Sequence, residues 1–394
     1  MFKSVLAHIL ASGALMAGLA GCATAPEPVV NPAASSSSST ASDTASASDA
    51  GLFIIGDTGV IGSEGSLATT SSMVRELCHD RLVCDFGMLS GDNIYPSGAT
   101  GDPAQDAPVF AALFTEPFGT IWDGKPGSEE RIFVALGNHD WYNGRAGAQA
   151  QVTFHEATRP FYMDGFFYSR RFTVRGKTVE IFVIDTEMLL ASETLPRYKK
   201  GADGEMVASG KFEKGGTPNA LPVTEQEQQQ ATWFAQALAA STADWKFVLG
   251  HHPIWQSRGD SKFAQSMKLR ELILPALCQN ADAYFAGHQH TIEVYSDSCE
   301  AVAGVKNAPL PLPQIVSGAG SKARSTDPDF MAWQAKTYPR IRSFFALGDT
   351  AGFVHIGLSG DTMTVTPITA GSDQSSRLHD PVIFTRRTGR SSGQ

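Results

Sequence analysis

Short apolar runs, each bounded by glycine or polar residues, recur along the chain between longer amphipathic stretches. Five runs have the length and the aliphatic and aromatic content of buried strands: residues 52–55, 86–90, 132–136, 246–249 and 283–286. Helices are predicted between them at about 71–79, 109–118, 225–240 and 263–277, the third opened by a capping box. This alternation predicts βαβ units and a largely parallel α/β core.

The other segments give weaker patterns. Residues 166–172 and 178–184 predict consecutive strands, and alternating segments between 291 and 369 predict a second sheet. Residues 196–223 are rich in glycine, lysine and proline and are expected to form a long surface loop. The segment 371–394 contains one short apolar run at 382–384, so an edge strand followed by a loose tail is expected.

Each of the five predicted strands is followed by glycine and then by a side chain that can bind a metal ion. These side chains are Asp57, Asp92, Asn138, His251 and His288. Ligands of open α/β folds bind where the carboxyl ends of strands meet. One such polar turn is commonplace, but five in series indicate a shared site.

Histidine is concentrated in the same turns. Five of the ten histidines lie in three of them: His139, His251, His252, His288 and His290. Outside this context lie His79, His155, His355 and His379. We expect these four to be surface residues or hydrogen-bonded core residues.

Composition and charge narrow the function. The 394 residues are 42% hydrophobic and 18% charged, as in a globular protein. A net charge of −9 argues against a nucleic-acid-binding surface. An anionic substrate remains compatible with this charge, because bound metal ions can reverse the local sign.

The first residues predict export. Lys3 precedes an apolar run at 5–19 that is short for a membrane span, as in a secretory signal. The ending Leu19-Ala20-Gly21-Cys22 resembles the lipobox of bacterial lipoproteins, which implies a signal peptide at 1–21 and a lipid on Cys22. Residues 22–50 would then be a flexible tether at the bacterial cell envelope, in the periplasm or on the outer membrane. An ordinary signal peptide with an incidental cysteine is the alternative.

The four remaining cysteines permit two disulfides in an exported protein. Pairing of nearest neighbours, Cys78 with Cys84 and Cys278 with Cys299, is one of three connectivities. Buried free thiols are the alternative. None of the four has the spacing of a Cys-x-x-Cys zinc site.

The five polar turns carry a resemblance to a known family. Gly-Asp-Thr-Gly, Gly-Asp-Asn-Ile-Tyr, Gly-Asn-His-Asp, Gly-His-His-Pro and Gly-His-Gln-His resemble, in order, the five blocks of the calcineurin-like metallophosphoesterases. Tyr95, three residues after Asp92, narrows the resemblance to the small, tartrate-resistant purple acid phosphatases. The resemblance spans roughly 51–370 and implies a four-layer α/β/β/α sandwich there, with 371–394 as an edge segment and tail.

The resemblance also implies a role for each residue. Those expected to hold a ferric ion are Asp57, Asp92, Tyr95 and His290. Those expected to hold a divalent iron, zinc or manganese ion are Asp92, Asn138, His251 and His288, with Asp92 as the bridge. Three anionic oxygens suit a hard trivalent ion, whereas two imidazoles and an amide suit a divalent one. His139 would contact the phosphate and protonate the leaving group, with Asp140 orienting it.

The function implied is hydrolysis of small phosphomonoesters at mildly acid pH by a metal-bound hydroxide. A phosphodiesterase or nucleotide pyrophosphatase on the same scaffold is one alternative. A lipid-anchored binding protein with a relict site is another, although all seven expected ligands are present.

One stretch departs from the family pattern. Small purple acid phosphatases carry a second catalytic histidine shortly after the Gly-His-x-Pro block, but residues 254–262 contain none. Asp260 lies near the expected place and could replace it as the acid, while Arg258 or Lys262 could bind phosphate. An ordinary solvated loop is the alternative. His252 is expected to line the site, and the loop 196–223 is a candidate lid.

Overall fold

The computed structural model describes residues 49–122, 131–259 and 262–388. The expected signal peptide, Cys22, nearly all of the tether and Asp260 lie outside the described residues.

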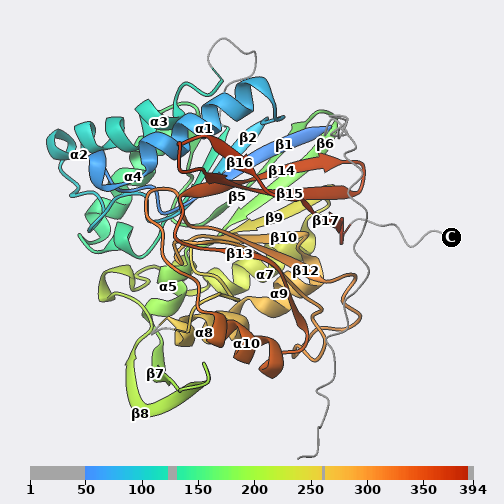
Figure 1. Ribbon diagram of the computed structural model, residues 1–394. Coiled ribbons are helices and arrows are strands. Elements are labelled where there is room, and N and C mark those ends of the chain that lie inside the picture. Colours follow the sequence, from blue (N-terminus) through green and yellow to red (C-terminus); the bar gives the residue numbers. More distant parts are fainter. Residues whose placement is uncertain (1–48, 123–130, 260–261, 389–394) are drawn as a thin grey trace, which may run out of the picture. The chain divides into compact units, whose positions relative to one another are not determined.

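Two large sheets form the centre of the domain (Figure 1). The first has the order β16-β15-β14-β1-β2-β3-β4, with β17 also paired to β15. Its strands are β1 Ala50–Ile55, β2 Phe86–Ser90, β3 Ile132–Ala135, β4 Phe161–Tyr162, β14 Gly352–Ser359, β15 Thr362–Ala370, β16 Ser376–Leu378 and β17 Val382–Thr385. Strands β1 to β4 are mutually parallel, and β14 runs antiparallel to β1.

The second sheet has the order β13-β11-β12-β10-β9-β6-β5. Its strands are β5 Tyr168–Val174, β6 Lys177–Val183, β9 Trp245–Leu249, β10 Ala283–Ala286, β11 Ile292–Asp297, β12 Leu312–Ser317 and β13 Ile341–Leu347. Its central strands β6, β9, β10 and β12 are parallel. The two consecutive strands predicted at 166–172 and 178–184 are β5 and β6, an antiparallel hairpin that turns at Arg175 and Gly176 with positive φ angles of 45° and 81°.

Helices cover the outer faces of both sheets (Figure 1). On the side of the first sheet lie α1 Leu67–Asp80, α2 Pro103–Phe110, the π-helical turn η2 Ala111–Thr115, α3 Glu116–Phe118 and α4 Arg145–Ala157. On the side of the second sheet lie α5 Thr186–Ala191, α6 Glu225–Gln228, α7 Gln230–Ala240, α8 Phe263–Leu272, α9 Leu274–Asn280 and α10 Pro328–Thr337. Short 3-10 turns are η1 Gly62–Glu64, η3 His139–Trp141 and η4 Pro218–Ala220. The expected four-layer α/β/β/α sandwich is confirmed.

Aromatic side chains pack the two sheets against each other. Phe172 of β5 lies 5.1 Å from Phe86 of β2, edge to face, and 5.1 Å from Phe133 of β3, stacked. Each such pair contributes about 0.5–1.5 kcal/mol beyond the burial of its area. This packing fixes the position of one sheet relative to the other.

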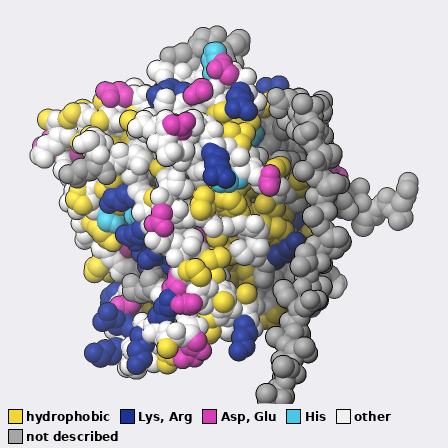
Figure 2. Space-filling model, viewed as in Figure 1, with side chains coloured by type: hydrophobic (Ala, Val, Ile, Leu, Met, Phe, Trp, Pro, Cys, Tyr) yellow, Lys and Arg dark blue, Asp and Glu magenta, His cyan; other side chains and the backbone are white. Residues whose placement is uncertain are grey.

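The segment 196–223 is largely not a loop, so this expectation was wrong. It contains most of a two-stranded hairpin, β7 Thr194–Lys200 and β8 Met206–Lys214. Tyr198 contacts Phe263, and Met206 packs in a small cluster with Phe263 and Phe330. The composition, rich in glycine and lysine, does not predict strands, because β7 and β8 pair through backbone hydrogen bonds that need no particular side chains. Lys and Arg side chains gather over this hairpin (Figure 2).

Other expectations about local structure had mixed outcomes. Both nearest-neighbour disulfides, Cys78–Cys84 and Cys278–Cys299, are present. The short apolar run at 382–384 lies in the strand β17, and the described residues that follow it, 386–388, are packed against the domain. Arg387 is 2% exposed and donates to carbonyl groups at the end of α9, including that of Cys278 (2.6 Å).

Candidate metal centre

The carboxyl ends of five strands from both sheets meet at one edge and bring the expected ligands together. β1, β2 and β3 lead to Asp57, Asp92 and Asn138, while β9 and β10 lead to His251 and to His288 with His290. All six side chains are buried. The backbone amide of His288 donates to Asp57 Oδ2 at 2.7 Å, which joins the ends of the two sheets.

A first group of donor atoms surrounds the phenolic oxygen of Tyr95. This oxygen lies 2.9 Å from Asp57 Oδ1, 2.9 Å from Asp92 Oδ2 and 3.1 Å from His290 Nε2. His290 Nε2 and Asp57 Oδ1 are 3.2 Å apart. Separations of this size are those of neighbouring ligands around one ion bound at about 2.0–2.2 Å.

A second group surrounds the other oxygen of Asp92. His251 Nε2 lies 3.3 Å from Asp92 Oδ1 and 3.1 Å from His288 Nδ1. Asn138 precedes His139, whose amide donates to the same Asp92 oxygen at 2.9 Å. The buried Asn138 Oδ1 has no hydrogen-bond partner among the described residues. A buried amide oxygen without a partner and two imidazoles are donors that suit a divalent ion.

Asp92 belongs to both groups, with Oδ2 in the first and Oδ1 in the second. The clusters Asp57, Asp92, His290 and Asp92, His251, His288 share this residue alone. A carboxylate placed in this way can bridge two ions.

Four of the candidate ligands have a strained backbone. The φ angles of Asp57, Asp92, His288 and His290 are 56°, 53°, 70° and 57°, in the left-handed region that non-glycine residues seldom adopt. Strain of this kind is concentrated at functional sites, where surrounding structure enforces it. Here it turns each side chain back toward the sheet edge.

The glycines that precede the ligands are required by close packing of the strand ends. A Cβ atom at Gly137 would lie 2.3 Å from Asp92 N, and one at Gly287 would lie 2.5 Å from Asp57 Oδ2. The repeated glycine in the sequence therefore reflects the approach of one strand end to the carboxylate of another.

Neighbouring groups orient two ligands. His251 Nδ1 contacts the Ser90 carbonyl oxygen at 2.8 Å, which leaves Nε2 facing Asp92. Asn138 Nδ2 donates to the Tyr142 hydroxyl at 2.6 Å, which leaves Oδ1 without a protein partner among the described residues. No sequence motif had indicated a role for Tyr142 at this site.

The electrostatics also fit bound cations. Burial would raise the pKa of Asp92, but the charge and hydrogen bond of His251 outweigh it, and the pKa lies well below its usual range. Burial and the carboxylates of Asp57 and Asp92 hold the pKa of Tyr95 well above 10. A cation binding to this phenol must therefore displace its proton, which couples metal binding to pH. Burial keeps the pKa of His288 low, so its imidazole is neutral, the form that ligates metal.

His139 lies at the open side of the centre, with 28% of its side chain exposed. Its Nδ1 contacts the Pro96 carbonyl oxygen at 2.5 Å, and its Nε2 lies 3.9 Å from Asp92 Oδ2. Burial lowers the pKa of His139, an effect that Asp92 partly offsets. The ring is packed between those of Tyr95 and Tyr142, whose centroids are 4.5 and 4.7 Å away.

Asp140 does not orient His139, contrary to the expectation. Its carboxylate accepts from the amides of Asn93 (3.1 Å), Ile94 (3.1 Å) and Gly137 (2.8 Å) and from the Gln151 side chain (3.1 Å). A buried carboxylate must satisfy its lone pairs, and here backbone amides do so. Asp140 therefore joins the turn after β2 to the turn after β3.

The segment 254–262 is only partly described, and Asp260 lies outside the described residues. The Arg258 guanidinium bonds the Ser325 carbonyl oxygen, and Lys262 Nζ bonds the His288 carbonyl oxygen at 3.0 Å. His252 lines the centre as expected, with its ring centroid 4.1 Å from that of His288.

Lys322 is a further residue at the centre that the sequence motifs did not indicate. Its ammonium lies 3.8 Å from the centroid of the Tyr95 ring. The sequence pattern that could have indicated Lys322 is a sixth strand followed by glycine, because the residue comes shortly after the Gly-Ala-Gly turn that ends β12.

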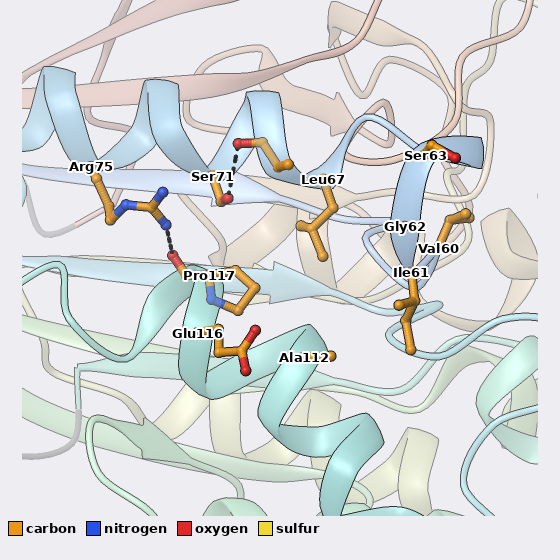
Figure 3. Close-up of a pocket in the computed structure, with 12 residues that line it drawn as sticks. Val60, Ile61, Gly62, Ser63, Leu67, Ser71, Arg75, Ala112, Glu116 and Pro117 are labelled. Atoms are coloured by element: carbon orange, nitrogen blue, oxygen red, sulfur yellow. Dashed lines mark hydrogen bonds between the residues drawn. The ribbon is translucent and has the colours of Figure 1, made fainter.

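A cavity of about 490 Å³ lies apart from the candidate ligands (Figure 3). It is lined by the turn from Val60 to Ser63, by α1 and by Pro117, and contains none of the candidate ligands. Arg75, its one basic side chain, donates to the Pro117 carbonyl oxygen at 2.7 Å. We assign no chemistry to this cavity.

Comparison with known proteins agrees with this arrangement. The sequence model of the calcineurin-like phosphoesterases matches residues 52–291. Purple acid phosphatase 17 of Arabidopsis thaliana is 27% identical over 273 residues, which cover 69% of this chain and 68% of that protein. Tartrate-resistant acid phosphatase type 5 of Mus musculus is 26% identical over 290 residues, which cover 73% of this chain and 75% of that protein.

Among solved structures, a purple acid phosphatase from yellow lupin seeds (Lupinus luteus) has the same fold. Its TM-score is 0.52 at 16% identity, covering 86% of this chain and 54% of the other.

Proposed function

The chain belongs to the calcineurin-like phosphoesterase family, and we propose that it is a dinuclear-metal acid phosphatase that hydrolyses small phosphomonoesters. The observation that carries the proposal is the placement of Asp92, with one carboxylate oxygen beside Tyr95 and the other beside His251. The two relatives found by sequence, both acid phosphatases, support the choice of reaction.

We assign a ferric ion to the first donor group, which is Asp57, Asp92, Tyr95 and His290. We assign a divalent iron, zinc or manganese ion to the second group, which is Asp92, Asn138, His251 and His288. When bound, such a pair supplies a hydroxide nucleophile at mildly acid pH and compensates charge on the phosphoryl oxygens.

The remaining steps fall to the protein's own side chains. The Pro96 carbonyl holds the proton of His139 on Nδ1, so Nε2 faces the open side of the centre. From there His139 can contact the phosphoryl group and, once protonated, donate a proton to the leaving alcohol. Asp140 fixes the two turns that carry Asp92 and Asn138. Asp260 remains a proposed alternative acid.

We also propose that the protein is exported and held by a lipid on Cys22 at the bacterial envelope, in the periplasm or on the outer membrane, with 51–370 as the catalytic domain. The two disulfides favour an exported protein. Within the described part of the chain, no helix has the length and apolar character of a membrane span.

The reaction is tested with p-nitrophenyl phosphate beside its bis ester, from pH 4 to 8, with and without a chelator. We expect faster hydrolysis of the monoester, an acid optimum, and loss of activity on chelation. Preferential hydrolysis of the bis ester would instead favour the phosphodiesterase. No hydrolysis of either ester by metal-loaded protein would favour a binding protein.

A further inference from the structure

We propose that Lys322 binds the phosphoryl group of the substrate and selects dianionic phosphomonoesters over monoanionic phosphodiesters. This inference rests on the proposed function, to which it adds a residue that sets substrate class.

The backbone on both sides of Lys322 is tied to ligand-bearing segments. The amide and hydroxyl of Ser321 donate to the Asp57 carbonyl oxygen at 3.0 and 2.5 Å. On the other side, the Arg324 amide donates to the His290 carbonyl oxygen at 2.9 Å. Lys322 therefore has a fixed place relative to two residues of the first donor group, which is the support a specific contact requires.

The Lys322 ammonium lies over the Tyr95 ring, 3.8 Å from its centroid, and the same ring packs against His139. Among the described residues, no carboxylate pairs with the half-buried Lys322. Its charge is thus compensated by a ring face, not by an anion.

Two cations of the segment 254–262 bond backbone carbonyl oxygens. Arg258 bonds the Ser325 carbonyl and Lys262 bonds the His288 carbonyl. Lys322 can therefore supply a positive charge at the open side, where the sequence has no second histidine shortly after the Gly-His-His-Pro turn.

Charge explains the selection. An ammonium is a compact point charge with three donors, well suited to phosphate oxygens. Above its second pKa of about 6, a phosphomonoester is a dianion with twice the charge of a diester, so its attraction to Lys322 at equal distance is twice as large. A second ester group also removes one of the oxygens that can accept from the ammonium.

The test compares Lys322→Met, which keeps the apolar stem, with Lys322→Arg, which keeps the charge. Lys306→Met is the matched control, since Lys306 is exposed and its backbone amide bonds Gln279 of α9. Two properties are measured: kcat/KM for p-nitrophenyl phosphate and its bis ester, and the Kd of orthophosphate for metal-loaded protein by calorimetry.

We expect Lys322→Met to lower kcat/KM for the monoester and to raise the phosphate Kd by about tenfold each, the loss of one charge-assisted hydrogen bond. The bis ester should change little, and Lys322→Arg and Lys306→Met should resemble the wild type. An unchanged phosphate Kd in Lys322→Met, or an equal fall for both esters, would overturn the inference.

A purely structural role of Lys322 can be recognised separately. If Lys322 served only to pack against Tyr95, Lys322→Met would change the metal content and the melting temperature of the protein. If the wild type hydrolyses neither ester, the proposed function fails, and the phosphate Kd still decides the role of Lys322.

Discussion

Three buried histidines at the candidate metal centre and one buried histidine on α4 have opposite surroundings. His251, His288 and His290 lie at the sheet edge within 3.3 Å of the nitrogen or oxygen atoms of other candidate ligands. His155, equally buried, lies on α4 among Phe114, Phe154 and Phe161, with ring centroids 4.4–5.2 Å away. Neither nitrogen of its ring has a hydrogen-bond partner among the described residues.

The difference shows that burial alone does not make a histidine a ligand. Burial lowers the pKa of His155 to about 3, whereas Asp92 overcomes the same burial effect and raises that of His251 to about 9. What separates the two regions is the presence of nitrogen or oxygen atoms of other candidate ligands within 3.3 Å of the imidazole. The expectation that His155 is either exposed or hydrogen-bonded was wrong.

The largest effect is expected when the shared carboxylate is removed. Asp92→Asn should eliminate the bridge and lower kcat by at least about 10³-fold, since metal ions supply several kcal/mol of catalysis. The ion content, measured by mass spectrometry, should fall below one per chain. Asp106→Asn is the control, because Asp106 is also buried but accepts from the amides of Thr100 and Gly101 away from the centre. Full metal content in Asp92→Asn would contradict the bridge.

Tyr95→Phe should have the next largest effect. Loss of the phenolate removes one anionic donor from the first group only, so iron should fall while the divalent ion remains. Any purple colour due to tyrosinate bound to ferric iron should disappear from the visible spectrum. A variant that keeps the colour would show that Tyr95 is not the ligand.

Tyr142→Phe should have a smaller effect. The variant frees the Asn138 amide from its 2.6 Å hydrogen bond and should weaken divalent-metal affinity by about tenfold, as is common for groups that orient a ligand. Competition with a chelator measures this affinity. Tyr198→Phe, in the β7–β8 hairpin, should be unaffected. Equal affinity in wild type and Tyr142→Phe would mean that Asn138 needs no orientation.

His155→Leu should leave activity unchanged and alter only stability. Because the folded protein keeps His155 neutral, the unfolded chain takes up a proton first as the pH falls, and stability is lost from about pH 6.5 down to about pH 3. The variant should therefore gain about 2 kcal/mol relative to the wild type between pH 7.5 and pH 5. Urea unfolding at both pH values, at matched metal content, measures the gain. A pH-independent difference would show that His155 is not the acid-sensitive group.

The histidine contrast also bears on what the sequence could predict. Five of the seven candidate ligands, Asp57, Asp92, Asn138, His251 and His288, follow a glycine at the end of an apolar strand. This local pattern was enough to predict the sandwich and to nominate these five residues. Tyr142 and Lys322 depend on contacts between distant segments, such as that of Ser321 with Asp57, 264 residues apart. Asp140 was assigned to its sequence neighbour His139, but its partners include the amide of Asn93 on another strand end. The β7–β8 hairpin was missed because backbone pairing leaves little trace in a glycine- and lysine-rich stretch.

The most direct test of the dinuclear centre is the metal content of purified wild-type protein, measured by mass spectrometry together with its visible spectrum. The proposed arrangement predicts two transition-metal ions per chain, at least one of them iron, and a visible absorption band that Tyr95→Phe abolishes. Folded, active protein with a single ion per chain, or with no iron and no such band, would contradict it.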